Sequence, residues 1–281
     1  MFADKKIAFI GPGMMAEAMI GGLVRKKVAP PENLLVSGPR QDRVDQLQQS
    51  YGCVPFTQNG EAVRQADVVV LAIKPQRMGA VLEELKGFVP QQALVLSIVA
   101  GAPVERISSF LDHDIVVRAM PNTPAQIGAG ISVWTAAESV SSDQKELARE
   151  ILSAFGQEVY VAEEDFLDKA TALSGTGPAY VYLFMEAMVD AGVHMGFSRR
   201  IAEKLVIETV RGSVNYYDRR DDSRHLARLR NQVTSPGGTS AEALYYLEKA
   251  GFRTAISRAI WAAYERSVAL GRGKVNTKIP K

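Results

Sequence analysis

The sequence predicts an α/β fold, in which a doubly wound, mostly parallel sheet is followed by a second, all-helical domain. Two observations predict the sheet: short apolar, β-rich runs alternate with segments long enough for helices, and several runs contain no polar residue. The alternation implies crossover connections and parallel strands, and uninterrupted apolar runs suit strands that helices cover on both faces. A third observation predicts the second domain, because β-branched runs give way to long helical stretches from about Asp165.

The individual elements follow from these patterns. The run Val68–Ile73 is typical of a strand that is buried on both sides. Strands are expected at residues 6–10, 34–37, 54–56, 68–73, 94–99 and 115–119, with 131–135 and 158–161 extending the same sheet. Helices are expected at residues 14–27, 41–49, 77–86, 178–195, 199–218, 240–250 and 253–270. The domain boundary is placed near residue 163, which gives an N-terminal domain of residues 1–163 and a C-terminal domain of residues 164–281.

Composition excludes several classes of function. The 33 Lys and Arg residues against 31 Asp and Glu residues give a formal charge of +2, and no run of like charges forms a nucleic-acid-binding arm. One cysteine, Cys53, and three scattered histidines supply neither a disulfide nor a metal ligand set, so no metal is expected. The N-terminus lacks the apolar stretch of a signal peptide, and no window approaches the ~20 apolar residues of a membrane span. We therefore expect a cytoplasmic protein with neither a membrane nor a nucleic acid as partner.

The stretch Ala179–Val189 is apolar on every side except at Glu186, and it is too short to span a bilayer. A helix of this kind must be buried all round. A small helical domain offers one chain few ways to do this, so we expect a homodimer with shared helices. Pro178 suits the first helical position and Gly196 the stop. The alternative is an ordinary core helix within a monomer.

A nucleotide fingerprint follows the first expected strand. That strand leads directly into Gly11-Pro12-Gly13-Met14-Met15-Ala16, a G-x-G-x-x-A pattern that opens a helix. Gly11 permits the tight turn, Gly13 lets a pyrophosphate approach the backbone, and Ala16 allows close packing of helix on strand. Free N–H groups and the helix dipole face the anion. In this context the pattern predicts dinucleotide binding by a Rossmann-like domain, whereas alone it would indicate only a turn.

The end of the second expected strand favours NADPH over NADH. An NAD-specific fold usually places an acidic residue there to bind the ribose 2′-hydroxyl, and this chain has none. Ser37-Gly38-Pro39-Arg40 instead offers a hydroxyl and a guanidinium suited to a phosphate, with Arg43 a turn later. NADPH is therefore the expected cofactor, with NADH the weaker one. The alternative is that both arginines simply begin a solvated helix.

Four further stretches carry a family resemblance. Val70–Gln76 follows the fourth strand and Ala119–Pro124 follows the sixth, so both lie at carboxyl ends of strands, where ligands bind in open sheets. Ser174–Ala179 and Leu229–Ser240 lie in the helical half. Together with the nucleotide loop, these stretches closely resemble pyrroline-5-carboxylate reductase from residue 6 to about residue 270. The Ser-Pro-Gly-Gly-Thr run is the most distinctive of them.

The resemblance implies a Rossmann-like N-terminal domain, a helical substrate-binding and dimerisation domain and, often, a ring of dimers. It implies hydride transfer from NADPH to the C=N bond of 1-pyrroline-5-carboxylate, which gives L-proline as the last step of proline biosynthesis. Matched positions beside the nucleotide are Asn59, Ala72, Lys74 and Pro75, and those around the substrate are Ser235, Thr239 and Ser240. Position 240 is threonine in much of the family, so this chain keeps the hydroxyl and loses a methyl group.

The substrate stretch can also be interpreted from its own chemistry. Thr239-Ser240-Ala241-Glu242 fits a capping box with Thr239 as the N-cap, and Gly237 and Gly238 leave the preceding backbone uncovered. The dipole end of a helix favours an anion, so a small carboxylate can sit on the amides near residues 238–241. A protonated imine needs no strong protein acid, so Ser240, with Thr239, is expected to orient the ring nitrogen and assist proton delivery. Taken alone, the pattern marks only the start of a helix.

Two rival functions stay open at this point. A hydroxyacid dehydrogenase of the 6-phosphogluconate type shares the two-domain plan. Such enzymes resemble one another in a lysine base with a nearby asparagine on the first long helix of the second domain, and residues 174–189 contain neither. A non-catalytic NADP-binding protein is the other rival, because a fold does not fix a function. Retention of both the nucleotide loop and the Ser-Pro-Gly-Gly-Thr run argues against it.

Overall fold

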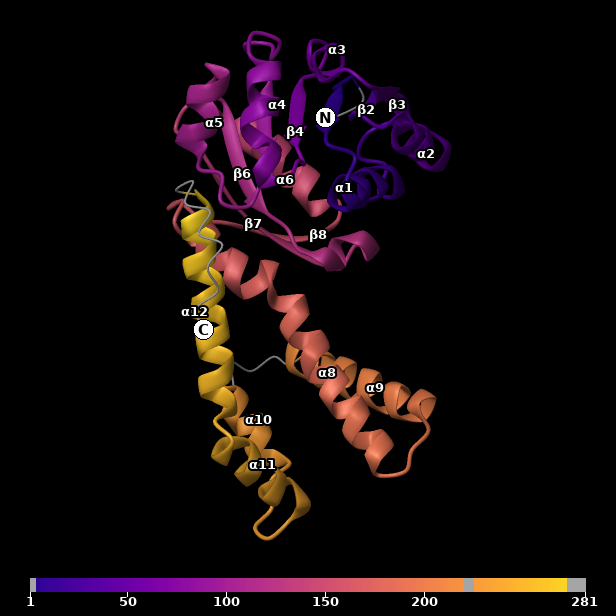
Figure 1. Cartoon of the computed structure of the whole chain (residues 1–281), viewed down its shortest axis with the longest axis vertical. Coiled ribbons are helices and arrows are strands. Elements are labelled where there is room, and N and C mark those ends of the chain that lie inside the picture. Colours follow the sequence, from indigo (N-terminus) through magenta and orange to yellow (C-terminus); the bar gives the residue numbers. More distant parts are fainter. Residues whose placement is uncertain (1–3, 220–224, 272–281) are drawn as a thin grey trace. The chain divides into compact units, whose positions relative to one another are not determined.

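The computed structural model describes residues 4–219 and 225–271 (Figure 1). The described chain forms two compact units. One consists of the chain up to Pro178 together with the segment from Ala263 onward, and the other is Ala179–Ala262. We call them the sheet unit and the helical unit. These units are defined by packing. The boundary near residue 163, which was placed where the sequence pattern changes, remains a proposal.

The sheet unit is built on one sheet of eight strands among the described residues, in the order β3-β2-β1-β4-β5-β6-β7-β8. Neighbouring strands are parallel except for β6 and β7, so the mostly parallel, doubly wound sheet is confirmed. Each expected strand is present, with ends that differ by at most two residues. The strands are β1 (Ile7–Ile10), β2 (Leu34–Ser37), β3 (Val54–Phe56), β4 (Val68–Leu71), β5 (Leu94–Ser97), β6 (Val116–Met120), β7 (Gly130–Ala136) and β8 (Gly156–Tyr160).

Helices cover both faces of this sheet because alternate residues of each buried strand point to opposite sides. Ile7 and Phe9 of β1 belong to a core shared with α1, α2 and α6, whereas Ala8 and Ile10 belong to a core shared with α3, α4 and α5. The helices of this unit are α1 (Met14–Arg25), α2 (Gln41–Tyr51), α3 (Asn59–Val63), α4 (Met78–Leu85), α5 (Val104–Leu111), α6 (Ser142–Ser153) and α7 (Phe166–Ala170).

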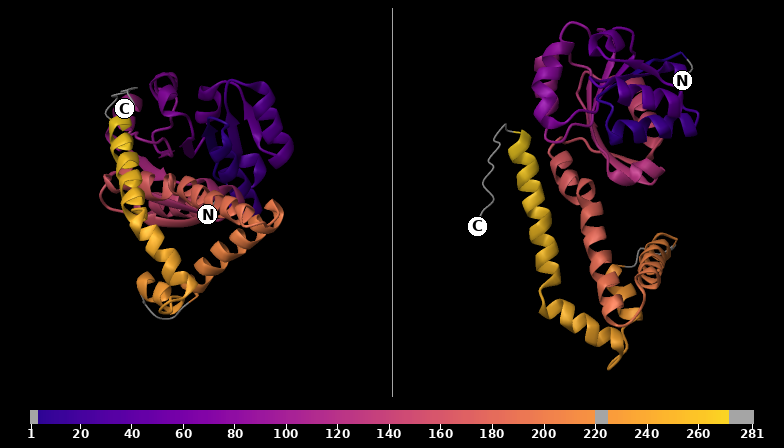
Figure 2. Two further views of the ribbon diagram at one scale, coloured as in Figure 1. Left: turned by 60° about the horizontal axis from the view of Figure 1, so that its bottom comes forward. Right: turned by 45° about the vertical axis from the view of Figure 1, so that its right-hand side comes forward.

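The chain then changes to helices, as the sequence predicts. They are α8 (Gly177–His194), α9 (Arg199–Asp218), α10 (Leu226–Gln232), α11 (Thr239–Lys249) and α12 (Phe252–Gly271), shown from two more sides in Figure 2. A small core of Val189, Ala202 and Val206 joins α8 to α9. Gly196, at φ +102°, ends α8 as expected, and Pro178 is its second residue. None of the described helices is long and apolar enough to cross a membrane.

The apolar stretch of α8 is exposed within the single chain. Val181, Tyr182 and Leu183 are 46%, 61% and 67% exposed. The alternative of an ordinary core helix within a monomer is therefore wrong. Contiguous apolar surface of this kind marks an interaction site, because leaving it in water forgoes its burial free energy.

Candidate nucleotide and substrate sites

The loop between β1 and α1 has the conformation that the fingerprint predicts. Gly11 lies at φ +96°, and a Cβ there would come within 2.7 Å of the Ala72 carbonyl oxygen, so only glycine fits. The Gly11 N–H donates to the Ser37 carbonyl at 2.9 Å, which ties the loop to the end of β2. Gly13 is the N-cap of α1 and provides no side-chain cap. The first-turn N–H groups of α1 therefore stay open to an anion.

A cleft of about 500 Å³ lies over this loop, at the carboxyl ends of β1, β2 and β4. It brings together seven of the expected cofactor residues, which are Gly11, Pro12, Gly13, Arg40, Asn59, Ala72 and Lys74. Among the lining residues, three are basic (Arg40, Lys74 and Arg77) and one is acidic (Glu84). This excess of positive charge suits a nucleotide phosphate. Among the described residues, no three His, Cys, Asp or Glu side chains gather as a metal site.

The other expected cofactor residues do not line the cleft. Ala16 is fully buried in the core, Met15 packs against that core, and Met14 is 70% exposed beside a different hollow. The buried Ser37 hydroxyl donates to Asn59 Oδ1 at 2.8 Å, so it orients Asn59 rather than facing a phosphate. Pro75 follows Lys74 and begins a 3₁₀ turn.

Two charged side chains that line the cleft, Arg77 and Glu84, were missed by the sequence reasoning. Arg77 follows Lys74-Pro75-Gln76 at the carboxyl end of β4, and this position was a signal that could have found it. Glu84 lies on α4 and accepts a hydrogen bond from Asn59 Nδ2 at 3.0 Å. No pattern in the sequence pairs positions 59 and 84.

The candidate substrate loop joins α10 to α11 in the helical unit. Here the expected capping box is wrong: the N-cap of α11 is Gly238, and no side chain caps the helix. The N–H groups of Ala241 and Glu242 both donate to the Gly238 carbonyl, so the helix begins one residue earlier than the pattern predicts. The Thr239 side chain therefore does not cap the helix, and the N–H groups of Thr239 and Ser240 in the first turn remain available to an anion.

The five expected substrate residues are contiguous with this helix start. Gly237 has φ +72°, which favours glycine, and the Gly238 N–H donates to the Ser235 carbonyl at 3.0 Å. A Cβ at position 238 would lie 2.6 Å from the Ser235 hydroxyl oxygen, so that side chain folds over the turn. Thr239 is exposed and Ser240 is half-buried in the first turn. The loop thus gathers three hydroxyl side chains at one bare helix end.

Two other family motifs meet inside the sheet unit. Asn122, after β6, donates from Nδ2 to the Ser174 carbonyl at 3.2 Å and accepts the Ile131 N–H at 3.0 Å. Ser174 belongs to a π-helical turn, Thr171–Gly175, between α7 and α8. Turns of this type often occur at functional sites. The amide of Asn122 thereby holds the start of the long helix against the carboxyl end of β6.

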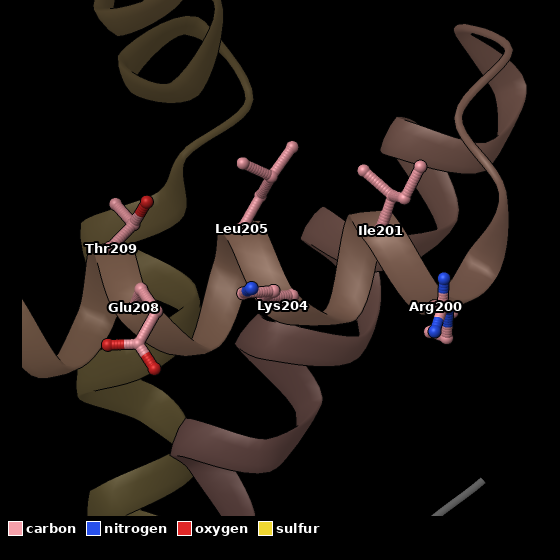
Figure 3. Close-up of a pocket in the computed structure, with 6 residues that line it drawn as sticks. All are labelled: Arg200, Ile201, Lys204, Leu205, Glu208 and Thr209. Carbon is pink, nitrogen blue, oxygen red and sulfur yellow. The ribbon is translucent and has the colours of Figure 1, made fainter.

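A hollow of about 630 Å³ lies along α9 and contains none of the expected site residues. Its lining, shown in Figure 3, is Arg200, Ile201, Lys204, Leu205, Glu208 and Thr209. Because one helix supplies all six side chains, the hollow is a helix surface. Ile201 and Leu205, one turn apart, are 47% and 50% exposed there. These side chains add to the exposed apolar residues of the helical unit.

The fold and the cleft together define an NAD(P)-dependent oxidoreductase of Rossmann-like architecture with an appended helical domain. Comparison with known families agrees with this class. A model described as NADP oxidoreductase coenzyme F420-dependent matches residues 6–101, and one described as pyrroline-5-carboxylate reductase dimerisation matches residues 164–270.

Individual relatives specify the family. The chain is 42% identical to pyrroline-5-carboxylate reductase of Synechocystis, over 95% of this chain and 98% of the relative. It superposes on the Plasmodium falciparum pyrroline carboxylate reductase with NADP bound at a TM-score of 0.88 and 33% identity, over 96% and 100% of the two chains. For the Coxiella burnetii enzyme these values are 0.85 and 36%, over 95% and 98%. The chain belongs to the pyrroline-5-carboxylate reductase family, whose members are NAD(P)H-dependent oxidoreductases of proline biosynthesis. Its match to the dimerisation domain of that family indicates a homo-oligomer.

The alternative of a hydroxyacid dehydrogenase is supported only by a similarity of fold. A 3-hydroxyisobutyrate dehydrogenase of Mycobacterium tuberculosis gives a TM-score of 0.51 at 16% identity, over 70% of this chain and 67% of that one. This likeness shows a shared architecture and carries no activity with it.

Proposed function

We propose that this chain transfers a hydride from NADPH to the ring C=N bond of 1-pyrroline-5-carboxylate and releases L-proline. The observation that carries the proposal is that this chain, a family member over nearly its full length, retains both an anion-receptive nucleotide loop and the bare helix start of the Ser-Pro-Gly-Gly-Thr run. A non-catalytic binder would have no need for the second feature, and a hydroxyacid dehydrogenase would need the lysine base that residues 174–189 lack.

The cofactor side of the proposal uses the cleft of the sheet unit. The pyrophosphate would bind at Gly11–Gly13 and the first turn of α1, where a helix dipole and open N–H groups favour an anion. The exposed Arg40 would pair with the 2′-phosphate, since β2 ends without an acidic residue. Asn59, Ala72, Lys74 and Pro75 would flank the rest of the nucleotide, which supplies the hydride when bound.

The substrate side uses the turn before α11. The carboxylate would accept hydrogen bonds from the N–H groups of Thr239 and Ser240, because those of Gly238 and Ala241 already donate to backbone carbonyls. Ser235, Gly237 and Gly238 would shape the turn. The hydroxyls of Ser240 and Thr239 would hold the protonated ring nitrogen. The hydride forms a C–H bond at the imine carbon, and the C=N π electrons become the amine lone pair. The proton on nitrogen is retained, so no strong protein acid is required.

The finer statements on assembly and location are part of the same proposal. The exposed apolar face of α8 supports a homodimer with shared helices, and dimers would associate further into a ring. The proposed domains are residues 1–163 for the nucleotide and 164–281 for the substrate and the dimer. A cytoplasmic location fits the unpaired, buried thiol of Cys53, because the cytoplasm is a reducing compartment.

The test is NADPH oxidation with 1-pyrroline-5-carboxylate, with L-proline measured as the product. Arg40→Asp should weaken the binding of NADPH by about 1–3 kcal/mol, since it places a like charge beside the 2′-phosphate. The binding of NADH should stay nearly unchanged. An unchanged dissociation constant for NADPH would remove Arg40 from the site. Nucleotide binding without turnover would support the non-catalytic alternative instead.

A further inference from the structure

Arg43 lies behind the nucleotide loop and outside the residues that line the cleft. Its Nε donates to the Pro12 carbonyl oxygen at 2.9 Å, which is the middle residue of the Gly-Pro-Gly turn. Its Nη2 pairs with the Glu17 carboxylate in the first turn of α1, and its Nη1 donates to Gln46 at 2.7 Å. All three nitrogens of the guanidinium therefore have protein partners.

The surroundings keep this arrangement in place. The Arg43 side chain is 14% exposed and that of Glu17 is 31% exposed, so the pair is partly shielded from water. The Tyr51 hydroxyl donates to the other Glu17 oxygen at 3.3 Å, and a Cβ at Gly21 would touch the Tyr51 ring at 3.2 Å. Burial, and then the negative charge of Glu17, raise the pKa of Tyr51, so its phenol remains a donor.

Holding one carbonyl fixes a whole peptide unit. Because the peptide bond is planar, a fixed Pro12 carbonyl also fixes the Pro12–Gly13 plane and the direction in which the chain enters α1. Glu17 is bonded through its own N–H to the Gly13 carbonyl at 3.0 Å, so Arg43 connects both ends of this first turn. The same first turn carries amides that no side chain caps, directly after the Gly11–Gly13 loop that lines the cleft.

We infer that Arg43, paired with Glu17, is a positioning residue that holds the Gly11–Gly13 loop ready for the pyrophosphate. The inference rests on the proposed nucleotide site. The two arginines, three residues apart, then have different roles. Arg40 binds the 2′-phosphate and so distinguishes NADPH from NADH, whereas Arg43 sets the affinity for the pyrophosphate that both nucleotides share. The sequence had suggested a phosphate contact for both.

The two roles predict different ratios of nucleotide affinity. A residue that contacts the 2′-phosphate affects NADPH and spares NADH. A residue that positions the pyrophosphate loop weakens both dinucleotides by the same factor. The ratio of the two dissociation constants separates these cases, and general damage to the fold would appear as a lower melting temperature.

The experiment measures both dissociation constants by titration calorimetry on the full-length protein and its Arg43→Met, Arg43→Lys, Glu17→Gln and Arg40→Met variants. Arg43→Met should raise the dissociation constants of NADPH and NADH alike by about tenfold or more, which is the scale of a lost hydrogen bond to a charged group. The ratio of the two constants should stay unchanged within about twofold. Arg43→Lys should recover part of this loss, because an ammonium keeps the charge but not the forked geometry. Arg40→Met, the matched control, should change the ratio.

Each outcome supports or overturns either the role of Arg43 or the proposed function. Loss of NADPH affinity alone in Arg43→Met would make Arg43 a phosphate ligand and overturn the inference, as would wild-type affinities for both nucleotides. If Arg43→Met does not fold, Glu17→Gln decides, since it should weaken both nucleotides in the same direction. If the wild-type chain binds neither nucleotide, the proposed function fails rather than this inference. At saturating NADPH, the KM for 1-pyrroline-5-carboxylate should stay at its wild-type value in Arg43→Lys.

Discussion

Replacing Gly38 by alanine tests whether the nucleotide loop works because it is held from behind. Gly38 follows β2 and is buried against the ring of Pro12. A Cβ at position 38 would lie 2.3 Å from Pro12 Cδ and 2.6 Å from Cγ. Gly38 does not have a positive φ, so alanine strains the contact and not the local backbone.

The size of the effect follows from this distance. Ordinary van der Waals contact begins near 3.4 Å, so the Pro12 ring must retreat by about 1 Å. Pro12 is the central residue of the Gly-Pro-Gly turn and its carbonyl is tied to Arg43, so the loop must move with it. A displacement of about 1 Å in a positioning element costs about 100-fold in rate. Overpacking should also cost about 1–3 kcal/mol of unfolding free energy.

The assay is steady-state kinetics with NADPH varied at saturating 1-pyrroline-5-carboxylate, together with urea unfolding. Gly38→Ala should lower kcat/KM for NADPH about 100-fold. The matched control is Gly79→Ala in α4, where a Cβ meets nothing within 4 Å and should stabilise the helix by about 0.5–1 kcal/mol. If Gly38→Ala keeps wild-type kcat/KM and stability, the close approach of Pro12 to position 38 does not set the loop, and the reasoning is refuted.

Three further results are expected. Ser240→Ala should keep the NADPH dissociation constant and lower turnover roughly tenfold to a thousandfold, because it removes a hydrogen bond to a group whose charge changes in the reaction; wild-type kcat and KM would exclude Ser240 from the mechanism. Arg118→Met should cost about 3 kcal/mol in urea unfolding, since the buried guanidinium bonds Glu164 at 2.9 Å and Asp168 at 3.2 Å, whereas the exposed Arg149→Met should leave the midpoint unchanged. Burial raises the pKa of the Cys53 thiol from about 9 to about 11, so stability should be full below pH 9 and fall by about 2 kcal/mol as the pH rises to 11; a Cys53 that reacts with a thiol reagent as fast in the folded as in the unfolded protein would contradict this.

Patterns local in sequence made the fold and the cofactor loop predictable. The alternation of apolar runs and helix-length segments gave the parallel sheet, and the glycines at positions 11 and 13 gave the nucleotide turn. The order of the eight strands and the antiparallel β7 depend on long-range pairing, which no local pattern contains. The same limit applies to Asn59, whose partners Ser37 and Glu84 lie 22 and 25 residues away in the chain.

Local patterns also misled where two arrangements have the same sequence. The Thr239–Glu242 spacing fits a capping box, but the extended backbone of Gly238 lets its carbonyl accept the first helical bond, so the helix starts one residue early. Arg40 and Arg43 look equivalent by position. They differ because Arg40 lines the cleft, whereas Arg43 contacts Pro12 and Glu17 of the preceding βα unit.

By itself, the sequence determined the succession of strands and helices along the chain, the glycine turn that admits an anion and the helix too apolar to remain in water. These depend on residues close together in the chain, where backbone geometry and periodicity act directly. The tertiary structure alone decided which side chains share the cleft, which arginine supports the loop and which amides of α11 stay open. Those outcomes depend on contacts between distant segments, and the free energy of each contact is fixed only once packing has brought its partners together.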